Sequence, residues 1–143
     1  MRISQRAEYA VKAVLDLAVH APNGRGVRSS EVARRTGVPE KFLEAILRDL
    51  REAGLVASKR GPDGGHWLAR DPSRVTVSAI LEAIDGPLSA VRAKRRGPVT
   101  PEEVCVHSLW GRVEVAVQDV LGTVTLDDLR QQASAPGALD FSI

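Results

Sequence analysis

The sequence predicts a mainly α-helical fold with one small β-hairpin. Two short amphipathic segments meet at Gly37, and a turn rich in glycine and proline follows them at 61–65. A third segment, 101–122, opens with a helix-capping pattern and repeats apolar residues every three or four positions. With 143 residues, of which 43% are hydrophobic, the chain has the size and apolar content of one small folded domain with an appendage.

Charge is distributed unevenly along the chain. The formal net charge is +2, but residues 1–70 hold 13 Lys and Arg against 8 Asp and Glu, a net of +5. Residues 71–143 hold 7 against 10, a net of −3. A basic first half indicates contact with a polyanion such as nucleic acid. On charge alone, an ordinary basic surface remains the alternative.

Several classes of protein are disfavoured by the composition. Cys105 is the single cysteine, so we expect no intrachain disulfide and a cytoplasmic location. No apolar run reaches the ~18 residues that a membrane span needs, and the charged start lacks a signal-peptide pattern. The sequence holds no nucleophile–base set, no metal-spaced histidines and no phosphate loop. We therefore expect neither an enzyme nor a membrane partner.

The first predicted helix lies within residues 3–18, where apolar residues recur at steps of three and four behind Ser4 as N-cap. A proline and two glycines in "APNGRG" then end it. Ser29 or Ser30 is the expected cap of a second helix, which ends at Gly37. This second helix opens the most organised stretch of the chain, "SSEVARRTGVPEKFLEAILRDLREAGLV".

A third helix is predicted to begin at Pro39, because the first helical position needs no N–H group. It carries a stripe of leucine and isoleucine and ends at Gly54. Two helices joined by a tight turn at a glycine form a helix-turn-helix. The third helix, 39–53, would be its recognition helix.

A β-hairpin is predicted directly after this motif. "LVASKR" and "HWLAR" read as short strands, and "GPDGG" is the turn between them. A hairpin in this place is a wing, here 56–70, although a plain surface hairpin is the alternative. We expect the glycines to let the wing turn sharply and approach another surface closely. Lys59 and Arg60 would supply charge for phosphate or a narrow groove.

The winged domain is expected to cover residues 1–85, with a last helix capped by Thr76. A loop at 86–100 with four basic residues follows. Helices are expected at 101–132, and the tail at 133–143 has no periodicity, which is typical of a mobile end.

The long helix has a strong start signal and a broad apolar side. Thr100, Pro101 and Glu103 form a capping box. Steps of three and four separate the members of one apolar stripe, which are Val106, Leu109, Val113, Ala116 and Val120. A neighbouring stripe holds Trp110, Val117 and Leu121. Two adjacent stripes indicate a partner, most simply the same helix of a second copy, whereas a core helix of a single chain is the alternative.

These parts in this order resemble the Rrf2 family of bacterial winged-helix repressors. The resemblance rests on "MRISQRAEYAVKAVLDLA", "VPEKFLEAILRDLREAGLV", "RGPDGGHWLAR" and "ILEAIDGPL…HSLWGRV…VTLDDL". It covers residues 1 to about 132. It implies a homodimer that binds double-stranded DNA at an imperfect palindrome near a promoter and usually represses transcription.

Candidate DNA contacts follow from the resemblance and from side-chain chemistry. The resemblance places contacts at the start of the recognition helix and on the wing, at Pro39, Glu40, Lys41, Glu44 and Arg60. Chemistry suits Glu44 to cytosine N4, and Lys41 and Arg48 to phosphate. We also expect phosphate contacts from Ser29 at a helix N-terminus and from Arg6. A solvated Glu44–Arg48 ion pair is the alternative for those two side chains.

The sequence departs from the family's cluster-binding members, which hold iron–sulfur with three cysteines. The loop 86–99 contains no cysteine, the resemblance puts the third cysteine on Val104, and Cys105 and His107 are too few ligands. We therefore expect no cluster and no metal, with Glu8 an exposed carboxylate. Three alternatives stay open: a winged-helix module that docks on protein, a redox sensor based on a thiol or a cluster, and a small-molecule or protein effector at 86–99. A cysteine buried in this valine-rich helix would be inert.

Overall fold

The computed structural model describes residues 3–21, 24–87, 99–135 and 137. Most of the basic loop predicted at 86–100, with its effector site, and most of the tail at 133–143 lie outside the described residues. The predicted helices and hairpin are present. In chain order they are α1 (Gln5–His20), α2 (Ser29–Thr36), α3 (Glu40–Glu52), β1 (Val56–Lys59), β2 (Gly65–Leu68), the 3₁₀ turn η1 (Pro72–Arg74), α4 (Val77–Asp85), α5 (Pro101–Thr123) and α6 (Leu126–Ser134).

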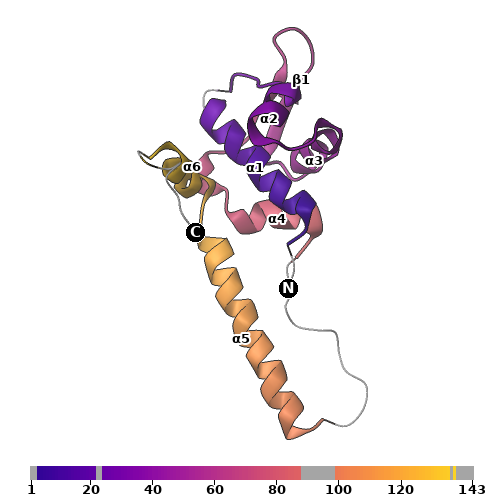
Figure 1. The fold of residues 1–143 in the computed structure, drawn as a ribbon, viewed down its shortest axis with the longest axis vertical. Helices are drawn as coiled ribbons and strands as arrows, with labels where there is room; N and C mark the ends of the chain where they lie inside the picture. The colour runs from indigo at the N-terminus through magenta and orange to yellow at the C-terminus, as the bar shows by residue number, and fades with distance from the viewer. Residues whose placement is uncertain (1–2, 22–23, 88–98, 136, 138–143) are drawn as a thin grey trace.

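Helix α1 is the centre of the winged domain (Figure 1), and α2, α3, α4 and α6 all contact it. It begins where the Ser4 hydroxyl accepts the Ala7 N–H at 3.0 Å. Its buried face is largely alanine, including Ala10 and Ala13, which lets neighbouring helices approach closely. The largest buried side chains around it are Leu17, Leu43, Ile46, Leu47, Leu50, Ile80 and Leu126. Burial of such side chains contributes about 1.5–3 kcal/mol each.

The helix-turn-helix is present, with two corrections at its caps. The N-cap of α2 is Arg28, not Ser29 or Ser30, and its side chain makes no capping bond. The Ser29 hydroxyl is instead drawn to a carboxylate on α3, as described below. Pro39 is the N-cap of α3 rather than its first residue, and Gly37 has the expected left-handed conformation, with φ 76°.

A residue outside the hairpin pairs with the wing, which the sequence did not predict. Strands β1 and β2 pair antiparallel, from Val56 opposite Leu68 to Lys59 opposite Gly65. Val27, just before α2, pairs with the other side of His66. The Val27 N–H donates to the His66 carbonyl at 2.9 Å, and the His66 N–H donates back at 2.8 Å. Strand β2 of the wing is therefore tied, close to its turn, to the segment that leads into the helix-turn-helix.

Gly65 and Gly26 serve this pairing rather than an approach to DNA, whereas Gly64 serves the turn, where a Cβ would collide with the Lys59 carbonyl oxygen. A Cβ on Gly65 would lie 2.6 Å from the backbone of Gly26, and a Cβ on Gly26 would lie 2.8 Å from the Gly64 carbonyl. Our expectation that these glycines clear space for another surface was wrong for Gly64 and Gly65, because the space is filled by the chain itself. Gly61, with φ +105°, is at the turn, and a Cβ there would meet no described atom within 4 Å.

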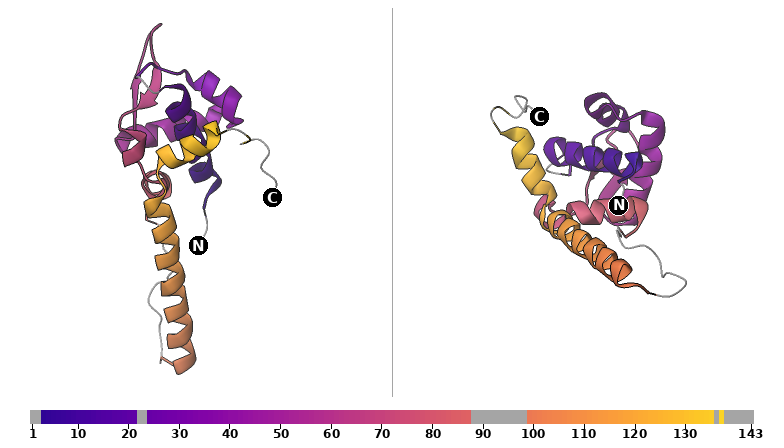
Figure 2. Two further views of the ribbon diagram at one scale, coloured as in Figure 1. Left: turned by 90° about the vertical axis from the view of Figure 1, so that its left-hand side faces the viewer. Right: turned by 60° about the horizontal axis from the view of Figure 1, so that its bottom comes forward.

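Helix α5 projects away from the winged domain (Figure 2). Its predicted capping box is present: the Thr100 N–H donates to Glu103 Oε2 at 3.0 Å, and the Glu103 N–H donates to Thr100 Oγ1 at 3.3 Å. Beyond it, Leu126 is fully buried and its N–H donates to the Val75 carbonyl at 2.8 Å, which anchors α6 against the domain. Of the helices within the described residues, none has the length and apolar character needed to cross a membrane.

Candidate nucleic-acid interface

A groove of about 710 Å³ lies between the start of α2, the exposed side of α3 and the wing. Its lining is polar and mostly charged. The lining residues are Arg28, Ser29, Ser30, Glu40, Glu44, Arg51, Ser58, Lys59, Arg60, Gly61, Gly65 and His66. The sequence places four basic side chains on this lining against two acidic ones. The groove therefore joins the two elements expected to read DNA, the recognition helix and the wing.

The predicted contact residues fall into two groups. Ser29, Glu40, Glu44, Lys59 and Arg60 line the groove together. The remaining predicted residues lie outside its lining: Pro39 caps α3, Lys41 and Arg48 are exposed on α3, and Arg6 is on α1. We did not predict Arg28, Ser30, Arg51, Ser58 and His66 as site residues from the sequence, and the contacts of Arg28, Arg51, Ser58 and His66 join different elements of the fold.

Glu44 is held by α2. The Ser29 hydroxyl donates to Glu44 Oε1 at 3.0 Å. A carboxylate has further acceptor sites, so this bond orients Glu44 and leaves it able to accept from a base. The alternative Glu44–Arg48 ion pair is not among the salt bridges between described residues.

Arg6 has a partner within the protein. Its Nη2 lies 2.7 Å from Asp49 Oδ2, and the Arg6 side chain is 49% exposed. An exposed pair of this kind adds only about 0–1 kcal/mol to stability. It does link α1 to α3, and it holds Arg6 toward a carboxylate that competes with phosphate.

Lys41 rests on an aromatic pair at the start of α3. Its Nζ lies 4.8 Å from the centroid of the Phe42 ring, and Phe42 stacks on Tyr9 with centroids 6.2 Å apart. Phe42 is 42% exposed. The ring orients the ammonium through a weak cation–π contact and keeps it accessible.

A polar chain crosses from α3 to the wing. Arg51 Nη1 donates to Ser58 Oγ at 3.3 Å, and Ser58 Oγ lies 2.5 Å from His66 Nδ1. Ser58 and His66 are opposite each other in the hairpin, which explains their contact. Partial burial, with the positive charge of Arg51, lowers the pKa of His66 below its ordinary value, while Glu44 opposes the shift. The neutral imidazole is therefore favoured in the groove.

Arg28 reaches the tip of the wing. Its Nη2 lies 3.0 Å from the carbonyl oxygen of Gly61 and 3.0 Å from that of Pro62. Nothing in the local sequence predicts this contact, because it joins residues more than 30 positions apart.

The packing of α2 against α1 depends on one buried ion pair. Arg35 Nε and Nη2 donate to the two oxygens of Asp16 at 2.9 and 3.0 Å, and Asp16 is the buried charged residue of the described core. Glu31 adds a contact to Arg35 at 3.2 Å. The hydrogen bonds to Asp16 raise the pKa of Arg35 above its ordinary value. This pair sets the position of α2, and with it one wall of the groove.

The predicted apolar stripe of α5 is largely uncovered in the single chain. Val106 is 50% exposed, Leu109 47% and Val120 60%, Ala116 is exposed, and Val113 is half-buried. Trp110 beside them is 43% exposed. Within the described residues, no side chain of α5 is fully buried. A single-chain core helix would not leave this face open to solvent.

The comparisons with known proteins agree with this geometry. The model of the Rrf2 family, described as an iron-dependent transcriptional regulator, matches residues 3–132. The chain belongs to the Rrf2 family. The regulator IscR of Pectobacterium atrosepticum is 35% identical over 130 residues, which cover 90% of this chain and 79% of that protein.

Solved structures of other regulators share this Rrf2 fold. The structure of CymR, the global cysteine regulator of B. subtilis, matches with a TM-score of 0.80 and 31% sequence identity. The match covers 92% of this chain and 97% of the CymR chain. The structure of T. potens IscR matches with a TM-score of 0.77 and 31% sequence identity. The match covers 99% of this chain and 97% of the IscR chain. The predicted resemblance and winged-helix fold are confirmed, and the chain is a DNA-binding transcriptional regulator rather than an enzyme.

The donor set of this Rrf2 chain does not fit an iron–sulfur cluster. Cys105 and His107 are two positions apart on α5, so their side chains point to different sides of the helix. The described residues contain no group of three or more His, Cys, Asp or Glu able to hold a metal ion. The sequence of the segment 88–98, outside the described residues, contains none of these four residue types.

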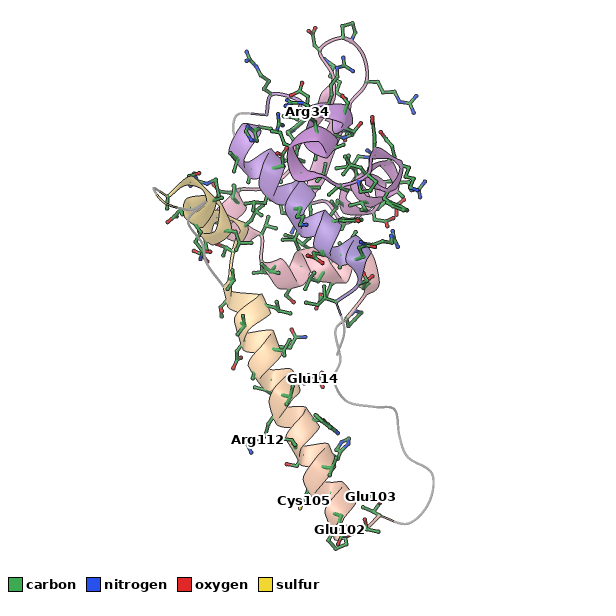
Figure 3. The ribbon with its side chains drawn as sticks, viewed as in Figure 1. Arg34, Glu102, Glu103, Cys105, Arg112 and Glu114 are labelled. Carbon is green, nitrogen blue, oxygen red and sulfur yellow. The ribbon has the colours of Figure 1, made fainter. Side chains whose placement is uncertain are left out.

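Cys105 differs from our expectation in its surroundings. It is exposed near the start of α5 (Figure 3), beyond Arg112 and Glu114 along the helix, so the expectation of inertness through burial does not apply to it. The reason is that α5 stands away from the winged domain in the single chain, so the valine-rich helix supplies no cover of its own.

Proposed function

We propose that this regulator is a homodimeric, sequence-specific repressor that binds a palindromic operator through the recognition helix 39–53 and the wing 56–70. The observation that carries the proposal is the groove in which α2, α3 and the wing bring Ser29, Glu44, Lys59 and Arg60 together. The resemblance to winged-helix repressors supports the repressing role.

Each side chain has a chemically distinct task in this proposal. Glu44 accepts a hydrogen bond from cytosine N4 in the major groove. Lys41 and Arg48, which lie on the same side of α3, bind phosphates, and Arg60 enters the minor groove. Glu40 and Pro39 set the edge of the base-reading surface. Lys59 and Ser29 contact the phosphate backbone of the DNA. Arg6 makes such a contact only if a phosphate displaces Asp49 from it.

The dimer forms through α5. The exposed stripe of Val106, Leu109, Val113, Ala116 and Val120 is an apolar surface on a helix that stands clear of its own domain. The same helix from a second copy presents a matching stripe, which gives a symmetric pair. Two winged domains related in this way suit the two halves of a palindrome.

DNA binding in this proposal needs no iron–sulfur cluster. A cluster takes about four thiolate or imidazole ligands, and one thiol and one nearby histidine do not supply them. A thiol switch at Cys105 and an effector at 86–99 remain secondary proposals. The protein is cytoplasmic in this proposal, because a single free cysteine and DNA binding are compatible in that compartment.

Selection of bound duplexes from a random DNA library tests the function. We expect the full-length protein to enrich an imperfect palindrome, with affinity falling steeply as salt rises. Enrichment of no sequence, with no salt-dependent binding to duplex DNA, would contradict the proposal and favour a winged-helix module that docks on protein.

A further inference from the structure

Three consecutive residues connect the two reading elements. Val27 pairs with strand β2 of the wing at His66, and Arg28 holds the tip of the wing. Ser29 donates to Glu44 on the recognition helix. A segment of three residues therefore contacts the wing at two points and the base-reading side chain at a third. This arrangement gives the segment control over the spacing between the wing and α3.

The contact of Arg28 lies directly beside Arg60. Gly61 and Pro62 follow Arg60 in the chain, and their carbonyl oxygens both lie 3.0 Å from Arg28 Nη2. The Gly61 carbonyl also accepts the Gly64 N–H at 2.9 Å, which closes the turn. A turn with glycine at 61, 64 and 65 has a large conformational freedom to lose, and hydrogen bonds from a charged donor restrict it.

We propose that Arg28 is a positioning residue for DNA reading, which fixes the wing tip so that Arg60 is presented at a set distance from Glu44. The inference rests on the proposed function. Arg28 acts through Arg60 and not as a phosphate contact of its own, because its Nη2 is directed to two carbonyls of the wing. Ordering the tip before binding removes part of the entropy cost of association.

Arg28→Ala is a clean substitution for this purpose. The Arg28 side chain makes no capping bond to α2, so its loss removes the wing contact without removing a helix cap. Arg34→Ala is the matched control, since Arg34 is an exposed arginine of α2 (Figure 3) and its loss removes the same charge. Thermal unfolding of each variant checks that the fold is kept.

The test is a double-mutant cycle on full-length protein with the selected operator and a random duplex. We expect Arg28→Ala to weaken operator binding about tenfold, with a smaller loss on the random duplex and an unchanged salt slope. In the Arg60→Ala background, Arg28→Ala should cause little further loss, because its effect passes through Arg60. Arg34→Ala should leave the ratio of operator to random affinity unchanged.

Two results would overturn the proposal. Equal losses on both duplexes with a salt slope reduced by about one make Arg28 a phosphate contact. Additive losses with Arg60→Ala make the two residues independent.

A measurement without DNA separates this proposal from the proposed function. The Gly64 amide should exchange faster with solvent in Arg28→Ala than in wild type, since its acceptor at Gly61 loses its second donor. An unchanged exchange rate of the Gly64 amide would overturn the positioning role of Arg28 even if operator binding is confirmed. A wild-type protein that binds no duplex contradicts the proposed function, and the exchange rates then still report whether Arg28 orders the wing.

Discussion

The hydroxyl of Ser29 donates to the carboxylate of Glu44 at 3.0 Å, and this bond joins the first residue of α2 to the exposed side of α3. The carboxylate that we propose reads a base is therefore oriented before DNA arrives. An oriented acceptor discriminates between bases better than a free one, because less side-chain entropy is lost on binding.

Glu44→Ala should relax base preference at one position in each half of the operator. A bidentate or well-oriented base contact accounts for about 1–3 kcal/mol of discrimination. Repeating the library selection with the variant measures it, with Glu52→Ala, an exposed carboxylate near the end of α3, as control. An unchanged preference at every position would show that Glu44 does not read a base.

Arg35→Ala should destabilise the protein by about 3 kcal/mol, because it removes both guanidinium hydrogen bonds of the buried Asp16 carboxylate and leaves it only the more distant His20 imidazole at 3.8 Å. Urea unfolding followed by circular dichroism measures the loss. The neighbouring Arg34→Ala removes the same charge from an exposed site and should change stability by less than about 0.5 kcal/mol. Similar stabilities of the two variants would contradict the structural role of the Asp16–Arg35 pair.

Stability should fall below neutral pH in a way that depends on His66. Burial lowers the pKa of His66 in the folded protein below its ordinary value of 6.5, so the unfolded chain binds the proton better. The associated stability is complete above about pH 6.5 and is lost as the pH falls toward the lowered folded pKa. Melting temperatures at pH 7.5 and 5.5 should differ less in His66→Gln than in wild type. The same difference in both proteins would refute this assignment.

Val113→Glu should separate the dimer, because it places an unpaired charge in the middle of the apolar stripe of α5. Sedimentation at tens of micromolar measures the change, with a wild-type dimer and a variant monomer as the expected result. Ser108→Glu adds the same charge on another side of α5 and should leave the dimer intact. A monomeric wild type would remove the basis for palindrome recognition.

Features set by local sequence were predictable, and features set by pairing between distant segments were not. The caps at Ser4, Thr76 and Thr100 depend on side chains within three residues, and all three are present. The hairpin followed from its turn residues in the same way. The sequence-derived cap at Ser29 was wrong because the competing partner, Glu44, is 15 positions away.

The candidate site was predictable in part for the same reason. Glu44 was predictable as a candidate because it lies on the exposed side of the recognition helix and because the family resemblance places a DNA contact there. Arg28 and His66 were not predictable as groove residues. The backbone pairing of Val27 with His66 and the contact of Arg28 with the wing tip bring them there. Two glycines, Gly65 in the wing and Gly26 before α2, make that pairing possible, since a Cβ at either position would collide with the backbone of the other segment.

The central claim is that two copies of this chain read a palindrome without a cluster. Equilibrium binding of anaerobically purified protein, with iron measured on the same sample, tests it on the selected palindrome, on a duplex with one half scrambled, and on a random duplex. We predict tight binding of two chains to the palindrome by iron-free protein, weaker binding to the half-site duplex and salt-dependent weak binding to the random one. Equal affinity for all three duplexes would contradict palindrome recognition by two copies of the chain. Operator binding that appears only with stoichiometric iron would contradict binding without a cluster.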